Sequence, residues 1–330
     1  MTAPRVDAPA CAVLGTGQIG TFAIRALVEA GWQVTAADKA PAASFVRRYG
    51  QFDGRLAALD VTDARTVRDF FADSGPHDAV IFAAGLTGHK AIADPDTARH
   101  IAVQGVRTVG AEMIARGIPR LVAVSSLAVY DTPNAGIKAI PESAPTAGPI
   151  GPYGSVIRAM EAALQDLGQS DALAIRILRT AGVFGPNRFD HGSHSSQLVE
   201  HLLYGAMQGM PIRLQGDWED CDDMIYARDV GRALAAAAAL ETPGLEIINV
   251  GTARTTSLRD LVRTIESVAG RADVTLEPRH APSRPITRPP LQVSRMAQVL
   301  GPTRYDLDAA IRDFARETNL IAAEAEGASS

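Results

Sequence analysis

The chain has 330 residues, 46% of them hydrophobic, and is long enough to bury a sizeable core without disulfides or metal ions. Its net charge of −5 argues against a protein that binds nucleic-acid phosphates through a basic surface. Two cysteines with no metal-ligand spacing around them, and no apolar run that could span a bilayer, predict a cytoplasmic protein without a metal site or a membrane partner.

From residue 11 to about 180, short β-branched runs alternate with amphipathic stretches, which is typical of a parallel sheet built from βαβ units. Helices are expected over 19–30 and 97–116, each closed by a glycine, and over 153–168. We therefore predict an α/β fold, a Rossmann-type doubly wound parallel sheet. Its strands are expected at 11–15, 33–37, 56–59, 79–83, 120–125 and 173–178.

Beyond residue 183 the periodicity loosens, which predicts a second, smaller lobe. We expect the Rossmann domain to span 1–183, with 224–250 returning to it. Residues 184–223 and 251–322 would form a C-terminal substrate-binding lobe, and 323–330 a flexible tail. The remaining elements are expected to be helices at 195–208, 228–240, 257–269 and 305–318, a strand at 247–250 and an acidic loop at 216–223.

The stretch VLGTGQIG, residues 13–20, ends the first expected strand and opens the first helix. It places Gly15, Gly17 and Gly20 at the G-x-G-x-x-G spacing of a dinucleotide-binding turn. The first two glycines let the backbone approach a pyrophosphate, the third lets the helix pack on the strand, and the helix N-terminus attracts negative charge. Gln18 and Ile19, which stand between them, are expected to lie against the same cofactor.

The residue that ends the second expected strand predicts which dinucleotide binds. Asp38 stands about 20 residues after the glycine turn, where a carboxylate accepts hydrogen bonds from the adenosine ribose hydroxyls. It would repel a 2′-phosphate, so we expect NAD as the cofactor and NADP as the less favoured alternative, which Lys39 beside it keeps open.

Two further turns follow the third and fourth expected strands. Asp60 and Val61, in ALDVTD, suit a contact with the adenine. The small residues Ala83, Ala84 and Gly85 suit a close approach of the backbone to the cofactor. Both segments could equally be a helix cap and a plain turn.

Several motifs stand in a fixed order along nearly the whole chain. They are GTGQIG, DVTD, AAG, VSSLAVYD (124–131), PYG with Glu161 eight residues beyond Tyr153, LRTAGVFGP (178–186), DDMIYARDV (222–230) and INVGT (248–252). In this order they resemble the extended short-chain dehydrogenase/reductase family, the NAD-dependent epimerase/dehydratase group. The resemblance implies that Ser126 and Tyr153 are catalytic, that Tyr153 also lies at the cofactor, and that the chain forms a homodimer through a helix bundle.

Four positions depart from the pattern of that family. Ile157 stands where the family has a lysine, four residues after Tyr153, and Ala102 stands where an asparagine is common. Members that act on nucleotide sugars hold the nucleotide with an Asn and an Arg at positions that are Gly182 and Asp222 here. These departures weaken the expectation of a nucleotide-sugar substrate.

The missing lysine changes the expected proton chemistry of Tyr153. Positions i and i+4 share a helix face, so Ile157 points where the ammonium would meet the phenol, and Arg158 lies about 100° further round. An ammonium ~4 Å away is worth ~4 kcal/mol at an effective dielectric of about 20, or ~3 pKa units. Reducing a carbonyl, which needs a neutral phenol, is therefore expected to suffer less than oxidising an alcohol, which needs a phenolate.

Three histidines near the expected substrate position are candidate acids or bases. His89 follows the AAG turn, and His191 and His194 follow GVFGP. An imidazole that titrates near neutrality suits proton transfer without help from lysine. Each of the three could equally be a surface histidine.

The expected substrate contacts are Thr87, Ser126, Asp222 and Arg284. Asp222 belongs to the acidic run GDWEDCDD (216–223), which could attract a cationic or amine-bearing substrate or be a solvated loop. Arg284 aligns with an arginine that grips substrate phosphate in nucleotide-sugar members of the family. It could hold a carboxylate or a phosphate, or be a surface arginine.

We therefore expect an NAD-dependent enzyme that transfers a hydride at a hydroxyl or carbonyl carbon of a small polar metabolite, sugar-like or from secondary metabolism. Net oxidoreduction and epimerisation both fit this expectation. One alternative is a lyase or isomerase on the same fold that keeps NAD as a bound element. The other is a non-catalytic NAD-binding sensor or partner-binding protein.

Overall fold

The structure is a computed structural model, and its backbone is described for residues 8–86, 88–130, 137–146, 151–170, 172–187, 192–278 and 286–327. Within these ranges, the side chains of His89 and of the residues after 317 lie outside the description.

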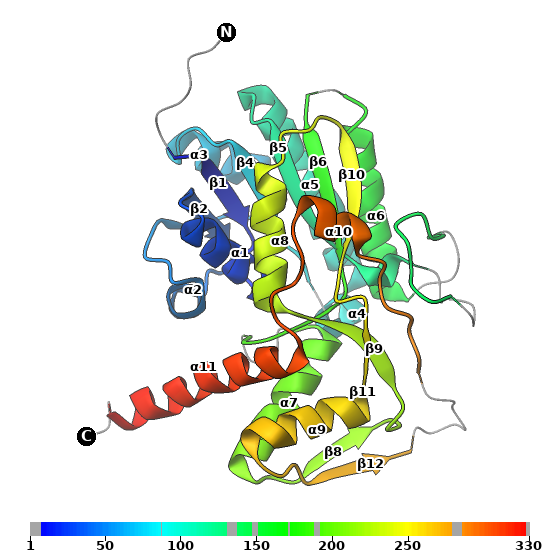
Figure 1. Ribbon diagram of the computed structural model, residues 1–330. Coiled ribbons are helices and arrows are strands. Elements are labelled where there is room, and N and C mark those ends of the chain that lie inside the picture. The colour runs from blue at the N-terminus through cyan, green and yellow to red at the C-terminus, as the bar shows by residue number, and fades with distance from the viewer. Residues whose placement is uncertain are drawn as a thin grey trace.

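A seven-stranded parallel sheet, in the order β10-β6-β5-β4-β1-β2-β3, forms the centre of the larger domain (Figure 1). This order confirms the predicted Rossmann-type doubly wound fold. The central strands are apolar on both faces because helices cover both sides of the sheet. The strands are β1 (Ala10–Leu14), β2 (Gln33–Asp38), β3 (Leu56–Ala58), β4 (Ala79–Phe82), β5 (Arg120–Ser126), β6 (Ala174–Thr180) and β10 (Leu245–Val250).

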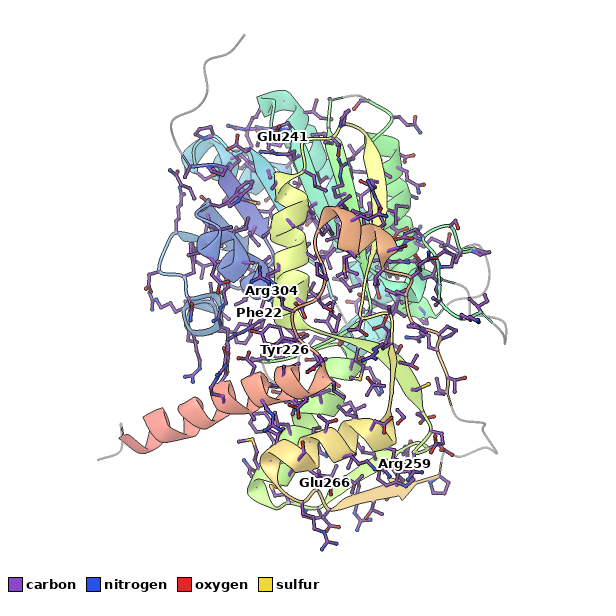
Figure 2. The ribbon with its side chains drawn as sticks, in the orientation of Figure 1. Phe22, Tyr226, Glu241, Arg259, Glu266 and Arg304 are labelled. Atoms are coloured by element: carbon purple, nitrogen blue, oxygen red, sulfur yellow. The ribbon has the colours of Figure 1, made fainter. Side chains whose placement is uncertain are left out.

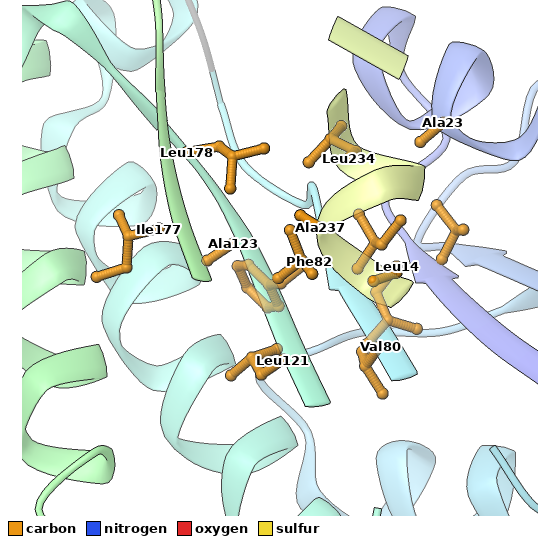
Figure 3. Packing of buried hydrophobic residues seen from close by; sticks show 14 of the residues in the cluster. Leu14, Ala23, Val80, Phe82, Leu121, Ala123, Ile177, Leu178, Leu234 and Ala237 are labelled. Carbon is orange, nitrogen blue, oxygen red and sulfur yellow. The ribbon is translucent and has the colours of Figure 1, made fainter. Parts of the chain in front are cut away.

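The helices of this domain pack in two main pairs, α1 with α8 and α5 with α6. Figure 3 shows Leu234 and Ala237 of α8 beside Phe82 and Leu178 of the sheet, within one buried hydrophobic cluster. The helices are α1 (Gln18–Glu29), α2 (Ala43–Gly50), α3 (Ala64–Asp73), α4 (Gly88–Ala93), α5 (Pro95–Arg116), the 3₁₀ turn η1 (Leu127–Val129), α6 (Pro152–Leu167), α8 (Ala227–Ala239) and α10 (Ser294–Val299).

A second lobe with its own buried cluster lies below the sheet in Figure 1. Its strands form a three-stranded sheet, β11-β9-β7, and a separate pair, β12-β8. The elements are β7 (Gly182–Phe184), α7 (His194–Gln208), β8 (Ile212–Gln215), β9 (Cys221–Tyr226), β11 (Thr255–Ser257), α9 (Leu258–Ala269), β12 (Val274–Glu277) and α11 (Leu307–Gly327).

Strand β9 contributes to both hydrophobic clusters. Met224 and Tyr226 belong to the cluster of the second lobe, and Ile225 between them belongs to the cluster of the larger domain. Successive side chains of a strand point to opposite faces, so this single strand completes two cores.

The structure differs from the expected boundaries in three places. Helix α10, which the boundary at 251 assigns to the second lobe, packs on β10 and α8 of the larger domain. The acidic segment 216–223 is not all loop, because β9 starts at Cys221. Helix α11 reaches Gly327 and so enters the stretch 323–330 expected as a tail, where Ala and Glu favour helix.

In the part of the chain that the structure describes, no helix is long and apolar enough to cross a membrane. No group of three or more His, Cys, Asp or Glu among these residues could hold a metal ion.

His77, just before β4, gives the fold a predicted pH dependence. It is 6% exposed, stacks on Phe70 and meets Phe71 edge-on. Both ring nitrogens lack a hydrogen-bond partner within the described chain, and burial lowers the pKa of the imidazole below 6.5. The unfolded chain therefore binds a proton that the folded chain does not. Stability should fall as the pH drops below about 6.5, by up to about 1.4 kcal/mol per pH unit.

Urea unfolding between pH 7.5 and 5.5 checks this expectation. His77→Phe should lose less stability than the parent over this range, because the buried imidazole no longer takes part. His100→Phe, at an exposed position of α5, should keep the parental slope. Equal slopes for His77→Phe and the parent would contradict the prediction.

Candidate functional site

The glycine turn between β1 and α1 is held in a conformation that only glycine fits at two positions. Gly15 has φ +97°, and a Cβ there would lie 2.5 Å from backbone atoms of Ala83 and Ala84. A Cβ on Gly20 would lie 1.8 Å from the carbonyl oxygen of Gly15. The turn is thus wedged between β1, the end of β4 and the first turn of α1.

Gly17 is the open position of this turn. It is the N-cap of α1, and among the described residues no side chain caps the helix there and no atom lies within 4 Å of a Cβ built on it. The first amide groups of α1 are therefore left for an anion, and the bare glycine lets that anion approach them. These features fit the pyrophosphate of a dinucleotide.

Gln18 and Ile19 are positioned by protein contacts. The Gln18 amide donates hydrogen bonds to the carbonyl oxygens of Gly185 (2.8 Å) and Pro186 (3.2 Å) and to the Ser196 hydroxyl (3.0 Å). Gln18 therefore ties the start of α1 to the second lobe, and Ile19 packs against the core. A cofactor contact of either residue stays a prediction.

Asp38 ends β2 with its carboxylate beside the glycine turn. One oxygen accepts hydrogen bonds from the amide of Thr16 (2.6 Å) and from its hydroxyl (3.2 Å), and the other accepts one from the Ala40 amide (3.0 Å). These bonds orient the carboxylate, and it retains lone pairs that ribose hydroxyls can use.

Lys39, which kept NADP open as an alternative, is paired with another acid. Its ammonium lies 2.7 Å from a carboxylate oxygen of Asp60. This hydrogen bond and those from the amide and hydroxyl of Thr62 hold the pKa of Asp60 at about 2. Asp60 thus forms the turn that the sequence left as an alternative, and its contact with adenine stays a prediction.

The small residues of the AAG turn follow β4 at the same edge of the sheet. Ala83 and Ala84 are partly buried, and Gly85 is exposed with open space at its Cβ position. Val61 is buried, and its side chain fills the space where a Cβ on Gly105 of α5 would lie. These positions are compatible with a nearby dinucleotide, and their contacts with it stay predictions.

Ser126 and Tyr153 are brought together at the carboxyl edge of the sheet. Ser126 ends β5, and its hydroxyl accepts a hydrogen bond from the amide of Ala128, which caps η1. Tyr153 lies in the first turn of α6, and Ser126 is near enough to act on its phenol. Desolvation of the partly buried side chain raises the pKa of Tyr153 to about 12, and Ser126 opposes this rise only in part.

The neighbours of Tyr153 on α6 offer it no charge. Ile157 is 8% exposed and belongs to the hydrophobic core. Arg158 donates a hydrogen bond to the carbonyl of Thr146. Burial and Ser126 are the two influences found on the pKa of Tyr153 within the described chain.

A buried polar network lies directly behind Ser126. Its neighbour Ser125 lies 2.5 Å from Glu161 of α6, which also receives two bonds from the guanidinium of Arg179, at 2.9 and 2.6 Å. Arg179 stacks on Tyr130, whose hydroxyl lies 2.5 Å from Asn249. The network fixes β5, β6, β10 and α6 around the serine. Sequence analysis noted Glu161 only as part of a motif, because its partners are distant in the chain.

Asn187 is a second group that sequence analysis missed. Both polar atoms of its amide are buried and have no hydrogen-bond partner among the described residues. It follows the carbonyl groups that hold Gln18 and lies beside Gly192 and Ser196. Such an amide is a group that a bound ligand can satisfy.

Asp222 is paired rather than free. Its carboxylate lies 3.0 Å from a guanidinium nitrogen of Arg288. Burial raises the pKa of Asp222, and Arg288 and His194 oppose this rise. His194 therefore lies within electrostatic reach of Asp222 at the exposed start of α7.

The other predicted residues are not placed. Thr87, His191 and Arg284 lie outside the described residues, as does the side chain of His89, whose backbone belongs to α4. Their roles stay predictions.

The contrast between two glycines of the turn yields a prediction. Gly17→Ala should fold with nearly the parental melting temperature, because φ is −67° and the Cβ position is open. Its affinity for NAD should fall at least about tenfold, since the methyl group occupies the approach to the helix amides. Gly20→Ala should lose about 1–3 kcal/mol of stability because the backbone must move.

Melting curves and calorimetric titration with NAD check both variants. Parental NAD affinity in Gly17→Ala would contradict the assignment of the turn.

Comparison with known proteins agrees with this geometry. Residues 12–251 match the family described as "NAD dependent epimerase/dehydratase family". A UDP-glucose 4-epimerase from Azospirillum brasilense is 29% identical over 273 residues, which cover 78% of this chain and 76% of that protein.

Solved structures share the fold. A UDP-glucose-4-epimerase from Stenotrophomonas maltophila with bound NAD and formylated UDP-arabinopyranose matches with a TM-score of 0.83 at 22% identity, over 96% of this chain and 99% of that one. A UDP-glucose 4-epimerase from Bifidobacterium longum in complex with NAD+ and UDP matches with a TM-score of 0.81 at 21% identity, over 94% and 98%.

Proposed function

Because the chain belongs to the NAD-dependent epimerase/dehydratase family, we propose that it transfers a hydride at a hydroxyl or carbonyl carbon of a small polar, sugar-like metabolite. The observation that carries the proposal is that Ser126 and Tyr153 lie together at the same sheet edge as the uncapped glycine turn. NAD, when bound, supplies the hydride acceptor or donor. Gly15, Gly17 and Asp38 would hold it.

The protein's own contribution is to hold and move a proton at the reacting oxygen. With a pKa of about 12, only about one Tyr153 in 10⁵ is ionised at pH 7. The neutral phenol suits donation of a proton to a carbonyl oxygen as that carbon is reduced. Ser126 would orient the same oxygen, and the network of Glu161 and Arg179 would keep the serine in place.

Two observations bear on the substrate, one for and one against a nucleotide sugar. The curated relatives are UDP-glucose 4-epimerases, which favours a sugar carried on a nucleotide. Asp222, however, stands where nucleotide-sugar members have an arginine, and it is paired with Arg288. Asp222 supplies no positive charge for a diphosphate and its partner Arg288 is already engaged, so we propose a sugar-like substrate that lacks a diphosphate or binds it elsewhere.

Two alternative functions are distinguished from hydride transfer by the experiment described below. A lyase or isomerase that keeps NAD as a bound element would be favoured by the low phenolate content of Tyr153, because it needs no alcohol oxidation. A non-catalytic sensor would be favoured by the aliphatic Ile157 in the core beside the phenol. We also propose a homodimer through the paired helices α5 and α6.

The experiment has two stages. Calorimetry with NAD and NADP, each oxidised and reduced, tests the cofactor. Incubation with UDP-glucose, UDP-galactose and free sugars, followed through reduced-nicotinamide absorbance and chromatography, separates net redox from epimerisation. Chemistry without any hydride exchange from labelled NADH would favour the lyase or isomerase, and NAD binding with no product from any sugar would favour the sensor.

A further inference from the structure

A cavity of about 310 Å³ lies between α1, α8 and the segment that leads into α11. Figure 2 labels Phe22 and Arg304 at this junction. Neither the glycine turn nor the pair of Ser126 and Tyr153 lines it. Its walls are formed by Phe22, Arg25, Ala26, Glu29, Arg228, Arg232, Arg304 and Tyr305.

The cavity wall is rich in arginine. Four of its charged side chains are arginines and one, Glu29, is an acid. The other carboxylates that pair with these arginines, Asp229, Asp313 and Glu317, are not among the lining residues. The ion pairs are Arg25 with Glu29 (3.0 Å) and Glu317 (3.2 Å), Arg228 with Asp313 (3.1 Å) and Glu317, and Arg232 with Asp229.

These pairs orient three guanidinium groups, and the fourth is unengaged. Arg304 is exposed, and no hydrogen bond or ion pair of its guanidinium occurs within the described residues. Its backbone is nevertheless anchored, because the Arg304 amide donates a hydrogen bond to Asp229 at 2.8 Å. All of its side-chain donors are therefore open to a ligand.

Arg232 experiences the positive charge of Arg304. It lies over the ring of Tyr305, 5.4 Å from the ring centre. Burial lowers its pKa first, and the charge of Arg304 lowers it further. A bound anion would relieve this repulsion, and phosphate matches the paired donors of a guanidinium.

The helices that form the wall are held at close contact. A Cβ on Gly231 of α8 would lie 2.2 Å from the carbonyl oxygen of Phe22 on α1. The cavity is thus formed before any ligand arrives, which lowers the cost of binding.

We propose that this cavity binds the phosphate group of a small phosphorylated metabolite. Arg304 has no carboxylate partner among the described residues and would pair with the phosphate. The charges of the other three arginines are offset by Glu29, Asp229, Asp313 and Glu317, so these arginines would contribute directed N–H donors. The cavity is larger than one phosphate, and Phe22, Ala26 and Tyr305 offer an apolar wall to the rest of the ligand. The Tyr305 hydroxyl accepts a bond from Arg228 at 3.2 Å and so keeps its own proton for the ligand.

The test measures binding of inorganic phosphate and of phenyl phosphate by calorimetry, against sodium chloride at equal ionic strength. Arg304→Gln is the decisive variant, because its side chain holds nothing in the fold. We expect its dissociation constant for phosphate to rise about tenfold or more. Arg259→Gln, which removes an equally exposed arginine paired with Glu219 in the other lobe, should bind as the parent does.

The glycine turn could also attract phosphate, so the titrations are repeated in Gly17→Ala. Binding that persists in Gly17→Ala and weakens in Arg304→Gln supports the proposal. Equal binding by Arg304→Gln and the parent, or loss of binding in Gly17→Ala, would overturn it. Tighter binding of phenyl phosphate would identify an ester as the ligand, and equal binding would identify the free anion.

Discussion

Tyr153→Phe is expected to lower kcat by about 10²–10⁴, because it removes the proton donor that meets the substrate oxygen. Phenylalanine fills the same space, so the fold should lose only about 1 kcal/mol with the hydrogen bond to Ser126. NAD affinity should change little, since the glycine turn and Asp38 are untouched. Steady-state kinetics, a melting curve and an NAD titration on one preparation separate these effects.

Ser126→Ala is the matched control for this change. It leaves the phenol in place and removes only the orienting hydroxyl, so it should reduce kcat by less than Tyr153→Phe does. If Tyr153→Phe retained the parental kcat on a substrate that the parent turns over, the phenol would not be the proton donor. The histidines near the substrate segment would then become the leading candidates.

Ile157→Lys should increase the rate of alcohol oxidation near neutral pH by up to about 10³. An ammonium close to the phenol stabilises the phenolate and lowers the pKa of Tyr153 by ~3 units, so a larger fraction is ionised. The pH optimum of oxidation should therefore shift downward. Carbonyl reduction should gain little, because the phenol is already neutral at pH 7. Initial rates in both directions between pH 6 and 10 measure these changes.

The substitution also places an amine where Ile157 is 8% exposed, so some loss of stability is expected. Ile157→Met introduces an unbranched side chain, as lysine does, but without the charge, and is the control for altered packing. It should leave the pH profile unchanged. A profile for Ile157→Lys that coincides with that of Ile157→Met would show that Tyr153 does not govern the reaction.

Local patterns were sufficient to predict the larger domain. Its central strands are short apolar runs buried on both faces, so they stood out in the sequence, and the observed ends of the strands lie close to the expected ones. The glycine turn was equally clear, because its three glycines meet needs that are local: a positive φ, an open approach and a close packing contact.

The side-chain partners could not be predicted in the same way. Lys39 was expected to bear on the choice between NAD and NADP, and its partner Asp60 follows another strand. Arg288 neutralises Asp222 from a segment 66 residues later. Such pairs depend on which loops meet in space, and neither periodicity nor motif spacing carries that information.

The burial of Tyr153 was also beyond the sequence. The missing ammonium predicted a pKa near its ordinary value, whereas burial raises that of Tyr153 to about 12. Both the missing ammonium and the desolvation favour the neutral phenol. The ionised fraction of Tyr153 at pH 7 is therefore smaller than the missing ammonium alone predicts.

Strand β9 limits how the second lobe, which we expect to bind the substrate, can be exchanged for another. Ile225 completes one core while Met224 and Tyr226 on either side complete the other. If the lobe were exchanged at this strand, one of the two hydrophobic clusters would lose the side chains that β9 contributes to it. New specificities are therefore more accessible through point changes in the loops than through transplanting the lobe as a module.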